Sequence, residues 1–242
     1  MKTGLIGCGN IGKEIAKYID SSEFFDLMYI HDLDEEKIEW ISNSLKRKPK
    51  STSFNELIEN SEFIIEAASV EAVKRILKQN LIGKKVMIMS AGGLIEEDIP
   101  KSSEIYIPSG AISGIDALKS VSGKIENLTI TTTKPSKGLP SNNINKKTVI
   151  FEGNLKEAIA EFPKNINVAA TIFLATNKEP KIKIIVDPNA KTNTHEITAL
   201  GSFGKITTKT ENIPSDNPKT SYLAILSAVQ CLKNIESNIK IG

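Results

Sequence analysis

The sequence predicts an α/β protein of two domains: an N-terminal doubly wound parallel sheet, then a second α+β domain built on a mixed or antiparallel sheet. Three observations support this fold class. Strand-like and helix-like segments alternate over the first hundred residues, strands dominate residues 128–211, and an apolar-striped helix closes the chain. Such alternation is typical of a parallel sheet covered on both faces. A run of strands is typical of antiparallel pairing.

In the first domain, residues 1–108, the spacing of apolar side chains defines the elements. Ile11, Ile15 and Ile19 recur on one helical face. Acidic residues in the first turn of residues 34–45 suit the positive end of a helix dipole. We expect strands at 3–7, 26–32, 61–69, 84–93 and just before Pro108, and helices at 10–20, 34–45 and 70–81.

The second domain, residues 109–216, should open with a helix from Ser109-Gly110 to Leu118. Helices are also expected at 155–161 and 165–176, and the latter is apolar on nearly every side, so it should be buried. We expect strands at 128–134, 147–153, 181–187, 195–201 and 204–211.

The last helix, within residues 217–242, should return to pack on the first domain. Asn217 is suited to the N-cap and Pro218 to the first helical position. Its expected apolar stripe consists of Tyr222, Ile225, Leu226, Val229 and Leu232.

Composition excludes several classes of partner. Lys and Arg number 31 against 29 Asp and Glu, a net charge of +2, which predicts neither nucleic acid nor a membrane surface as partner. No apolar run reaches the ~20 residues that cross a bilayer. The two cysteines and two histidines show no metal-ligand spacing, so we expect no metal and a reducing, cytoplasmic location.

The stretch "GLIGCGNIGKEI" has the G-x-G-x-x-G spacing at Gly7, Gly9 and Gly12. Gly7 permits the tight turn after the strand, Gly9 lets a pyrophosphate approach the backbone, and Gly12 lets helix and strand pack closely. N–H groups near Asn10 and Ile11 would then point at the anion. Because the motif joins a predicted strand to a predicted helix, it indicates a Rossmann-type dinucleotide site.

A carboxylate at the end of the second strand supports the same prediction. Asp32 follows Gly12 by 20 residues, where it can accept the ribose hydroxyls of NAD. His31 and Lys37 could soften its repulsion of a 2′-phosphate, so the cofactor is NAD or NADP. Ligands in this architecture bind beyond the carboxyl ends of the strands. Ala68, Ser69, Met89 and Ser90 are therefore further candidates for cofactor contacts.

Several stretches together resemble the L-aspartate dehydrogenase family over essentially the whole chain, least specifically at Leu33–Asn60. They are "IGCGNIG", "YIPSGAISGIDAL", "TTTKPSKGL", "VIFEGNLKEAIAEFPKNINVAATIFLA", "VDPNAKTNTHEI" and "ENIPSDNPKTSYLAILSAV". The resemblance implies NAD(P)-dependent oxidation of L-aspartate to iminoaspartate, which hydrolyses to oxaloacetate and ammonia and in many organisms feeds NAD biosynthesis. It also implies a cytoplasmic homodimer, with the second domain supplying the interface.

The family's acid–base histidine corresponds here to His195, and its cofactor contacts in the second domain to Ala111 and Asn167. On residues alone, a histidine within a strand is more often structural. Yet an imidazole with an ordinary pKa near ~6.5 suits removal of a proton from an amine. A substrate with two carboxylates needs several donors, for which the candidates are Ser109, Gly110, Lys219, Thr220 and Lys134.

Two alternatives remain open at the level of sequence. Another Rossmann two-domain oxidoreductase, dihydrodipicolinate-reductase-like or homoserine-dehydrogenase-like, would share the glycine loop and the general plan. A non-catalytic NAD(H)-binding sensor would bind cofactor without turning over any amino acid. The segments around His195 and Asn167 favour an aspartate dehydrogenase over the other oxidoreductases. The presence of both a complete glycine loop and an equipped second domain argues against the sensor.

Overall fold

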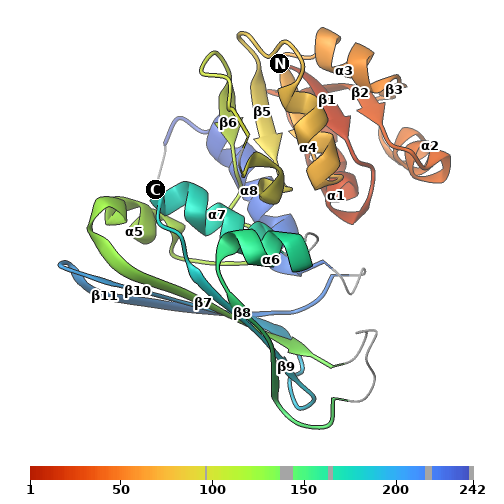
Figure 1. Ribbon diagram of the computed structural model, residues 1–242. Helices are drawn as coiled ribbons and strands as arrows, with labels where there is room; N and C mark the ends of the chain where they lie inside the picture. The colour runs from red at the N-terminus through yellow and green to blue at the C-terminus, as the bar shows by residue number, and fades with distance from the viewer. Residues whose placement is uncertain (96, 137–143, 163–165, 216–219, 240–242) are drawn as a thin grey trace. The chain divides into compact units, whose positions relative to one another are not determined.

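The first sheet in a computed structural model of the chain has six parallel strands in the order β3-β2-β1-β4-β5-β6 (Figure 1). The structure describes residues 1–95, 97–136, 144–162, 166–215 and 220–239. Its contacts divide the chain into two units, Met1–Pro108 with Ile225–Ile241, and Ser109–Ala224. The strands are β1 (Lys2–Ile6), β2 (Asp26–His31), β3 (Lys50–Ser51), β4 (Phe63–Glu66), β5 (Lys85–Ile88) and β6 (Glu104–Tyr106).

Helices pack on both faces of this sheet. Leu5 of β1 lies in an apolar cluster with side chains of α1 on one face. On the other face a Cβ added at Gly4 would lie 2.5 Å from a methyl of Leu57, so α3 packs tightly against β1. The helices are α1 (Asn10–Ser21), α2 (Glu35–Ser44), α3 (Phe54–Asn60), α4 (Val70–Leu77) and the 3₁₀ helix η1 (Ala91–Leu94).

The second unit is built on a five-stranded mixed sheet in the order β11-β10-β7-β9-β8. Only the central β7–β9 pair is parallel, and the other neighbours run antiparallel. Helices α5, α6 and α7 lie over one face of this sheet (Figure 1). The strands are β7 (Ile125–Pro135), β8 (Thr148–Gly153), β9 (Lys181–Asp187), β10 (Asn193–Gly201) and β11 (Gly204–Asn212); the helices are α5 (Ile115–Ser120), η2 (Ser122–Lys124), α6 (Leu155–Glu161) and α7 (Asn167–Thr176). The predicted fold class is thus confirmed.

The predicted helix from Ser109 to Leu118 is wrong in its first half. Helix α5 begins only at Ile115. Gly110 and Gly114 have φ values of +68° and +76°, in the left-handed region that a continuing right-handed helix excludes. Residues 107–114 therefore form an irregular loop without the repeating backbone hydrogen bonds of a helix.

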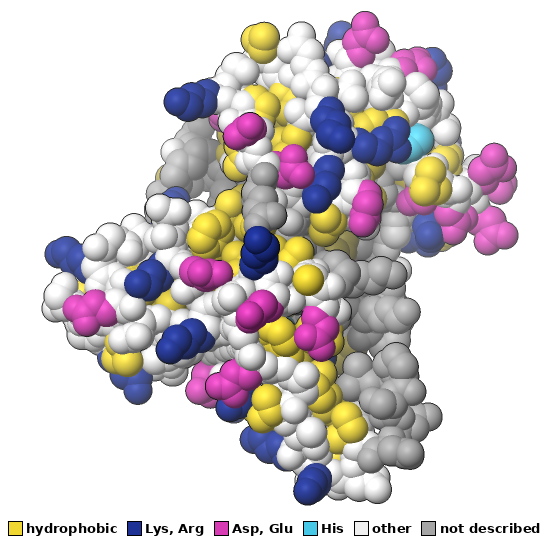
Figure 2. Space-filling model, in the orientation of Figure 1, with side chains coloured by type: hydrophobic (Ala, Val, Ile, Leu, Met, Phe, Trp, Pro, Cys, Tyr) yellow, Lys and Arg dark blue, Asp and Glu magenta, His cyan; other side chains and the backbone are white. Residues whose placement is uncertain are grey.

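Charged side chains of both signs are mixed over the visible surface (Figure 2). This matches the near balance of 31 basic and 29 acidic residues in the sequence. Within the described chain, none of the helices combines the length and the apolar character that a bilayer crossing requires.

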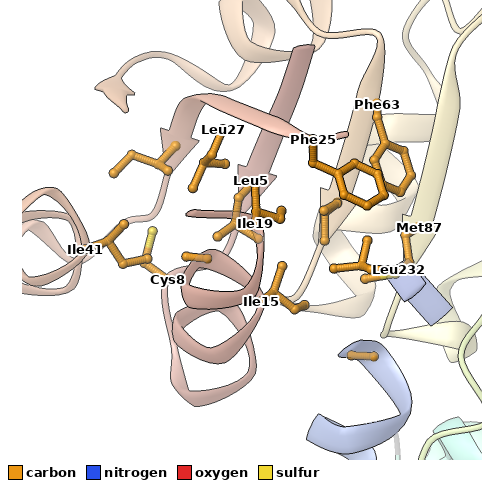
Figure 3. Close-up of a cluster of buried hydrophobic side chains, with 14 of the residues drawn as sticks. Leu5, Cys8, Ile15, Ile19, Phe25, Leu27, Ile41, Phe63, Met87 and Leu232 are labelled. Atoms are coloured by element: carbon orange, nitrogen blue, oxygen red, sulfur yellow. The ribbon is translucent and has the colours of Figure 1, made fainter. Parts of the chain in front are cut away.

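The core of the first unit includes side chains from both ends of the sequence. Leu5, Ile15 and Phe63 are buried together with Met87 of β5 and Leu232 of the last helix, α8 (Tyr222–Glu236) (Figure 3). At the far end of this helix, the Glu236 carboxylate accepts a 2.7 Å hydrogen bond from the Tyr18 hydroxyl and a second bond from Ser22. Side chains of α8 thus pack in the apolar cluster of the first unit.

The predicted stripe of α8 is only partly correct. Ile225 and Leu232 are buried, but Tyr222 and Leu226 are 52% and 46% exposed, and Ala228 takes the place between the two buried side chains. The buried face of α8 therefore consists of Ile225, Ala228 and Leu232, at positions i, i+3 and i+7. The small side chain of Ala228 allows the helix to approach the core closely. Asn217 and Pro218 lie outside the described residues, and the described helix begins at Tyr222.

Three elements of the first unit were not predicted: the short strand β3, helix α3 and the 3₁₀ helix η1. The strand expected at 84–93 is too long, because β5 ends at Ile88 and η1 occupies Ala91–Leu94. The Ser53 side chain caps α3 by accepting from the Glu56 N–H. Helix α7 differs from expectation in burial, since Ala169, Ala170 and Ile172 are buried while Phe173 and Leu174 remain partly exposed.

Candidate active site

The glycine loop turns sharply between β1 and α1. Gly7 has a φ of +96°, and its N–H donates to the His31 carbonyl at 2.8 Å. A Cβ at Gly12 would lie 1.9 Å from the Gly7 carbonyl oxygen, whereas a Cβ at Gly9 would meet no atom within 4 Å. Gly12 is thus required by the fold, and Gly9 leaves its side of the loop open to a ligand.

The start of α1 offers backbone donors beside this opening. Gly9 is the N-cap and supplies no side-chain cap, and the first intrahelical bond is Lys13 N–H to the Gly9 carbonyl at 2.8 Å. The N–H groups of the first turn, which include those of Asn10 and Ile11, have no partner inside the helix. Such groups and the helix dipole favour an anion such as a pyrophosphate.

Asp32 is fixed against the same loop. One carboxylate oxygen accepts the Cys8 N–H at 2.6 Å and the other accepts the Asp34 N–H at 3.0 Å. A carboxylate has about four lone-pair sites, so each oxygen can accept one more hydrogen bond. The Asp32 carboxylate is therefore fixed by two backbone N–H groups, and both of its oxygens can still accept a hydrogen bond from a ribose hydroxyl.

A pocket of about 350 Å³ adjoins the loop and Asp32. It brings together the predicted Gly7, Gly9, Asp32, Ala68 and Ser69. It also contains residues that the sequence reasoning missed as site residues. They are Ile6, Leu33, Phe54, Ala67, Glu71, Ala72 and Arg75.

Arg75 and Phe54 form one wall of this pocket. The guanidinium carbon lies 3.9 Å from the centroid of the Phe54 ring. Arg75 belongs to α4, whose N-cap is the predicted candidate Ser69. Phe54 belongs to α3, for which the sequence analysis found no signal. Together they offer a flat cationic and aromatic surface, which suits a nucleotide base.

We expect Asp32→Ala to shift the preference of the protein toward NADP. The change removes a hydrogen-bond acceptor for the ribose and a negative charge that repels a 2′-phosphate. One charge-assisted hydrogen bond is worth about 1.5–3 kcal/mol, so the ratio of kcat/KM for NAD to that for NADP should fall roughly 10–100-fold. Asp32→Asn is the matched variant, because its amide oxygen can still accept the Cys8 N–H. An unchanged ratio in both variants would show that Asp32 does not contact the ribose.

Glu66 links the loops that follow β4 and β5. Its buried carboxyl group accepts the Ala68 N–H at 2.7 Å, and the Ser90 N–H and hydroxyl, both at 2.9 Å. Burial raises the pKa of this carboxyl group despite the three hydrogen bonds. Ser90 is buried with its donors engaged, and Met89 packs against the apolar core, so neither lines the pocket. Their predicted cofactor contacts stay predictions.

In the second unit, His195 lies in β10 between β7 and β11. Its Nδ1 is 2.9 Å from the Thr132 hydroxyl, and Thr210 is its partner on the other side. Burial, and next the positive charge of Lys134, lower the pKa of His195 to about 4. The imidazole is therefore neutral at pH 7 and able to accept a proton.

The loop that contains Ala111 is hydrogen-bonded to β11, the strand next to β10. The Ala111 carbonyl accepts hydrogen bonds from the Thr210 hydroxyl and the Asn212 amide, both at 3.0 Å. The Asn212 amide oxygen in turn accepts from the Ser221 hydroxyl at 2.9 Å. The second unit thus brings the Ser109–Ala111 loop close to the strand that carries His195.

The remaining predicted residues lie around these elements. Thr220 precedes α8 rather than opening it, and its carbonyl accepts the Ser215 N–H at 2.8 Å. Asn167 is the first residue of α7, while Ser109 and Gly110 lie in the loop before α5. Lys219 lies outside the described residues. The roles of all these residues stay predictions.

The described residues contain no group of three or more His, Cys, Asp or Glu side chains that could hold a metal ion. Cys8 and Cys231 are both free, and burial raises the pKa of the Cys8 thiol to about 12. The thiol inside the glycine loop is therefore protonated at neutral pH and serves as a small apolar side chain.

Two family models match successive parts of the chain. Residues 7–104 match "Homoserine dehydrogenase, NAD binding domain" and residues 116–235 match "Aspartate dehydrogenase, C-terminal". The nucleotide half therefore does not distinguish the aspartate dehydrogenases from the homoserine dehydrogenases, and the second half does.

Whole-chain relatives agree with the second model. An L-aspartate dehydrogenase of Methanosarcina barkeri is 42% identical over all of this chain and 99% of its own. One from Nitrosopumilus maritimus is 39% identical with the same coverage. The crystal structure of aspartate dehydrogenase from Thermotoga maritima superposes with a TM-score of 0.79, at 32% identity over 100% of this chain and 99% of that one. These matches confirm the resemblance seen in the sequence: the chain belongs to the L-aspartate dehydrogenase family.

Proposed function

We propose that the protein catalyses the NAD(P)-dependent oxidation of L-aspartate to iminoaspartate, which hydrolyses to oxaloacetate and ammonia. The observation that carries the proposal is the coexistence of two features in a family member. One is a glycine loop and aspartate built for a dinucleotide. The other is a histidine that is neutral at pH 7.

The residues of the first unit fit the cofactor. The open side of Gly9, the N–H groups at the start of α1 and the fixed Asp32 carboxylate match a pyrophosphate and a ribose. The Arg75–Phe54 wall supplies a surface on which the adenine can lie. When bound, NAD(P)⁺ supplies the hydride acceptor. Asn167 and Ala111 are proposed to complete the cofactor contacts from the second unit's chain.

His195 acts as the general base of the reaction. The neutral imidazole takes one proton from the substrate ammonium group and thereby frees the nitrogen lone pair. That pair forms the C=N bond as the Cα hydrogen leaves with its electrons, and the product is a protonated imine. In the tautomer that donates Nδ1–H to the Thr132 hydroxyl, Nε2 carries the lone pair that accepts the proton. The same imidazole can later assist the attack of water on the imine.

The decisive experiment measures reduced nicotinamide by absorbance after purified protein is mixed with L-aspartate and either NAD or NADP. We expect turnover with L-aspartate and at most weak turnover with D-aspartate, L-glutamate or L-homoserine. Turnover of homoserine alone would support the homoserine-dehydrogenase-like alternative. Cofactor binding without turnover of any amino acid would support the sensor alternative.

We further propose a cytoplasmic homodimer whose product feeds NAD biosynthesis, with no nucleic-acid partner. Support comes from the family, from two free thiols, and from the mixed surface charge (Figure 2). Exposed apolar side chains of the second unit, Val149, Leu200 and Ile213, are suited to an interface between copies. Light scattering after gel filtration should give twice the mass of the 26.4 kDa chain.

A further inference from the structure

Glu66, the last residue of β4, has a buried carboxyl group whose hydrogen-bond donors come from two loops. Its Oε1 accepts the Ala68 N–H at 2.7 Å and the Ser90 hydroxyl at 2.9 Å, and its Oε2 accepts the Ser90 N–H at 2.9 Å. A buried carboxyl group is costly unless such donors surround it. None of the ion pairs among the described residues includes Glu66. The loops, rather than a cation, therefore satisfy this group.

The carboxyl group continues the pairing of β4 and β5 beyond the ends of the strands. The two strands are parallel neighbours, and the Met89 N–H donates to the Glu66 carbonyl at 3.1 Å. The next N–H along the chain, that of Ser90, donates to the Glu66 side chain instead. Buried N–H groups without an acceptor are rare in folded proteins, so the path of both loops depends on this one side chain.

The loop after β4 is in direct contact with the glycine loop. A Cβ added at Gly7 would lie 2.5 Å from the Ala67 carbonyl oxygen and 2.7 Å from the Ala68 nitrogen. This is the peptide group whose N–H donates to Glu66. Ala67 and Ala68 also line the pocket, together with Gly7 and Gly9. Glu66 therefore fixes a peptide group that both supports the glycine loop and borders the pocket.

The loop after β5 reaches the same pocket through helix α4. Ser90 is the N-cap of η1. A Cβ added at Gly93 of η1 would lie 2.6 Å from the Val73 Cβ and 2.9 Å from the Val70 carbonyl oxygen. Helix η1 thus packs closely on α4, which contributes Arg75 to the pocket. The two sets of hydrogen bonds to Glu66 therefore act on parts of one pocket.

We propose that Glu66 is a positioning residue of the cofactor pocket. Its carboxyl group holds the loops after β4 and β5 before the cofactor arrives, so that the Ala67–Ala68 peptide and α4 already have the arrangement that NAD or NADP binds. Loops that are ordered in advance lose less conformational entropy on binding, and the affinity is higher. This inference rests on the cofactor-binding part of the proposed function and assigns Glu66 no step in the chemistry.

Glu66→Gln tests the inference with almost no change of volume. The amide keeps one acceptor oxygen, but its NH₂ group turns a donor toward the N–H of Ala68 or Ser90. We expect the Kd of NADH and of NADPH to rise roughly 10–100-fold, as for loss of a hydrogen bond to a charged group. The KM for the cofactor should rise by a similar factor, while kcat with L-aspartate should change by less than about threefold.

The Kd can be measured without turnover. Trp40 is the single tryptophan of the chain and packs against the core of the first unit, so energy transfer from it to the reduced nicotinamide reports binding. Glu62→Gln is the matched control, because the Glu62 carboxylate accepts the Lys2 N–H at 2.8 Å at the amino end of β4. It should leave the Kd of NADH unchanged.

Hydrogen exchange distinguishes positioning from a purely structural role. Without cofactor, the Ala68 and Ser90 amides of Glu66→Gln should exchange at least about tenfold faster than those of the wild type. Saturating NADH should slow them again, because the bound cofactor orders the loops. Ser90→Ala is the milder variant: it removes one hydroxyl and leaves both N–H groups paired with Glu66. Its Kd for NADH should rise about two- to fivefold.

The inference is overturned if folded Glu66→Gln binds NADH as the wild type does, even with a lowered Tm, because the carboxyl group would then only stabilise the fold. If Glu66→Gln does not fold, an unchanged Kd in Ser90→Ala overturns it. Weaker NADH binding by Glu66→Gln, with no oxidation of L-aspartate by the wild type, would refute the proposed reaction and support the inference. Wild-type Kd in Glu66→Gln with normal oxidation of L-aspartate would do the reverse.

Discussion

His195→Ala is expected to lower kcat for L-aspartate oxidation roughly 10²–10⁴-fold, the usual contribution of a general acid–base group. The wild-type imidazole is neutral at pH 7, since burial lowers its pKa to about 4. Alanine removes the acceptor for the ammonium proton, so few substrate molecules present a free lone pair. The Kd for NAD should change little, because the glycine loop and Asp32 are separate from β10 in the chain. Stopped-flow measurement of nicotinamide reduction gives kcat and KM separately.

Two comparisons make this prediction specific. Exogenous imidazole should partly restore turnover in His195→Ala, whereas a variant that lost its fold would not respond. His31→Ala is the matched histidine control; because His31 lines the pocket beside Asp32, its loss should raise the KM for cofactor rather than lower kcat. Near-normal kcat in His195→Ala would remove His195 from the mechanism.

Gly12→Ala is expected to damage the first unit itself. The new Cβ would lie 1.9 Å from the Gly7 carbonyl oxygen, and a backbone atom cannot rotate away as a flexible side chain can. Overpacking of this kind costs about 1–3 kcal/mol or more, so Tm should fall by roughly 3–10 °C in a chain of this size. Scanning calorimetry measures the loss, and cofactor affinity should fall with it.

Gly9→Ala is the matched control, with the opposite balance of effects. Its φ of −72° suits alanine, and no atom lies within 4 Å of the added Cβ. We expect a change of stability of about 1 kcal/mol or less, as for N-cap substitutions. NAD affinity should nevertheless fall at least tenfold, because the methyl group occupies the side from which a pyrophosphate approaches. Wild-type affinity in Gly9→Ala would place the pyrophosphate elsewhere.

Local patterns were sufficient to predict most of the fold. Glycine spacing and apolar periodicity predicted β1, α1 and β2, and a helix was expected around Leu155–Glu161, where α6 lies. Where the prediction was wrong, conformation depended on something other than periodicity. Helix α5 begins only at Ile115, because Gly110 and Gly114 have left-handed backbone conformations. In α8 the small side chain of Ala228 lets the helix pack closely on the core, and this determines which of its residues are buried.

The candidate site was less accessible from the sequence than the fold. Asp32 could be predicted, because its distance from the glycines is set by the length of one helix and one strand. The Arg75–Phe54 wall could not, since it joins two helices from separate crossovers. The neighbourhood of His195 depends on the β7–β10 register, which single-strand patterns do not reveal. Its role was indicated by the family resemblance.

The return of α8 to the first unit affects how the protein can fold during synthesis. Domains generally form in order as the chain leaves the ribosome. Here the apolar cluster around Leu5 and Ile15 is completed by Ala228 and Leu232 of α8, which follow the whole second unit in the chain. Until α8 has been synthesised, the nucleotide-binding unit therefore has an uncovered apolar surface. A nascent chain that stops before α8 would keep that surface exposed to chaperones and proteases.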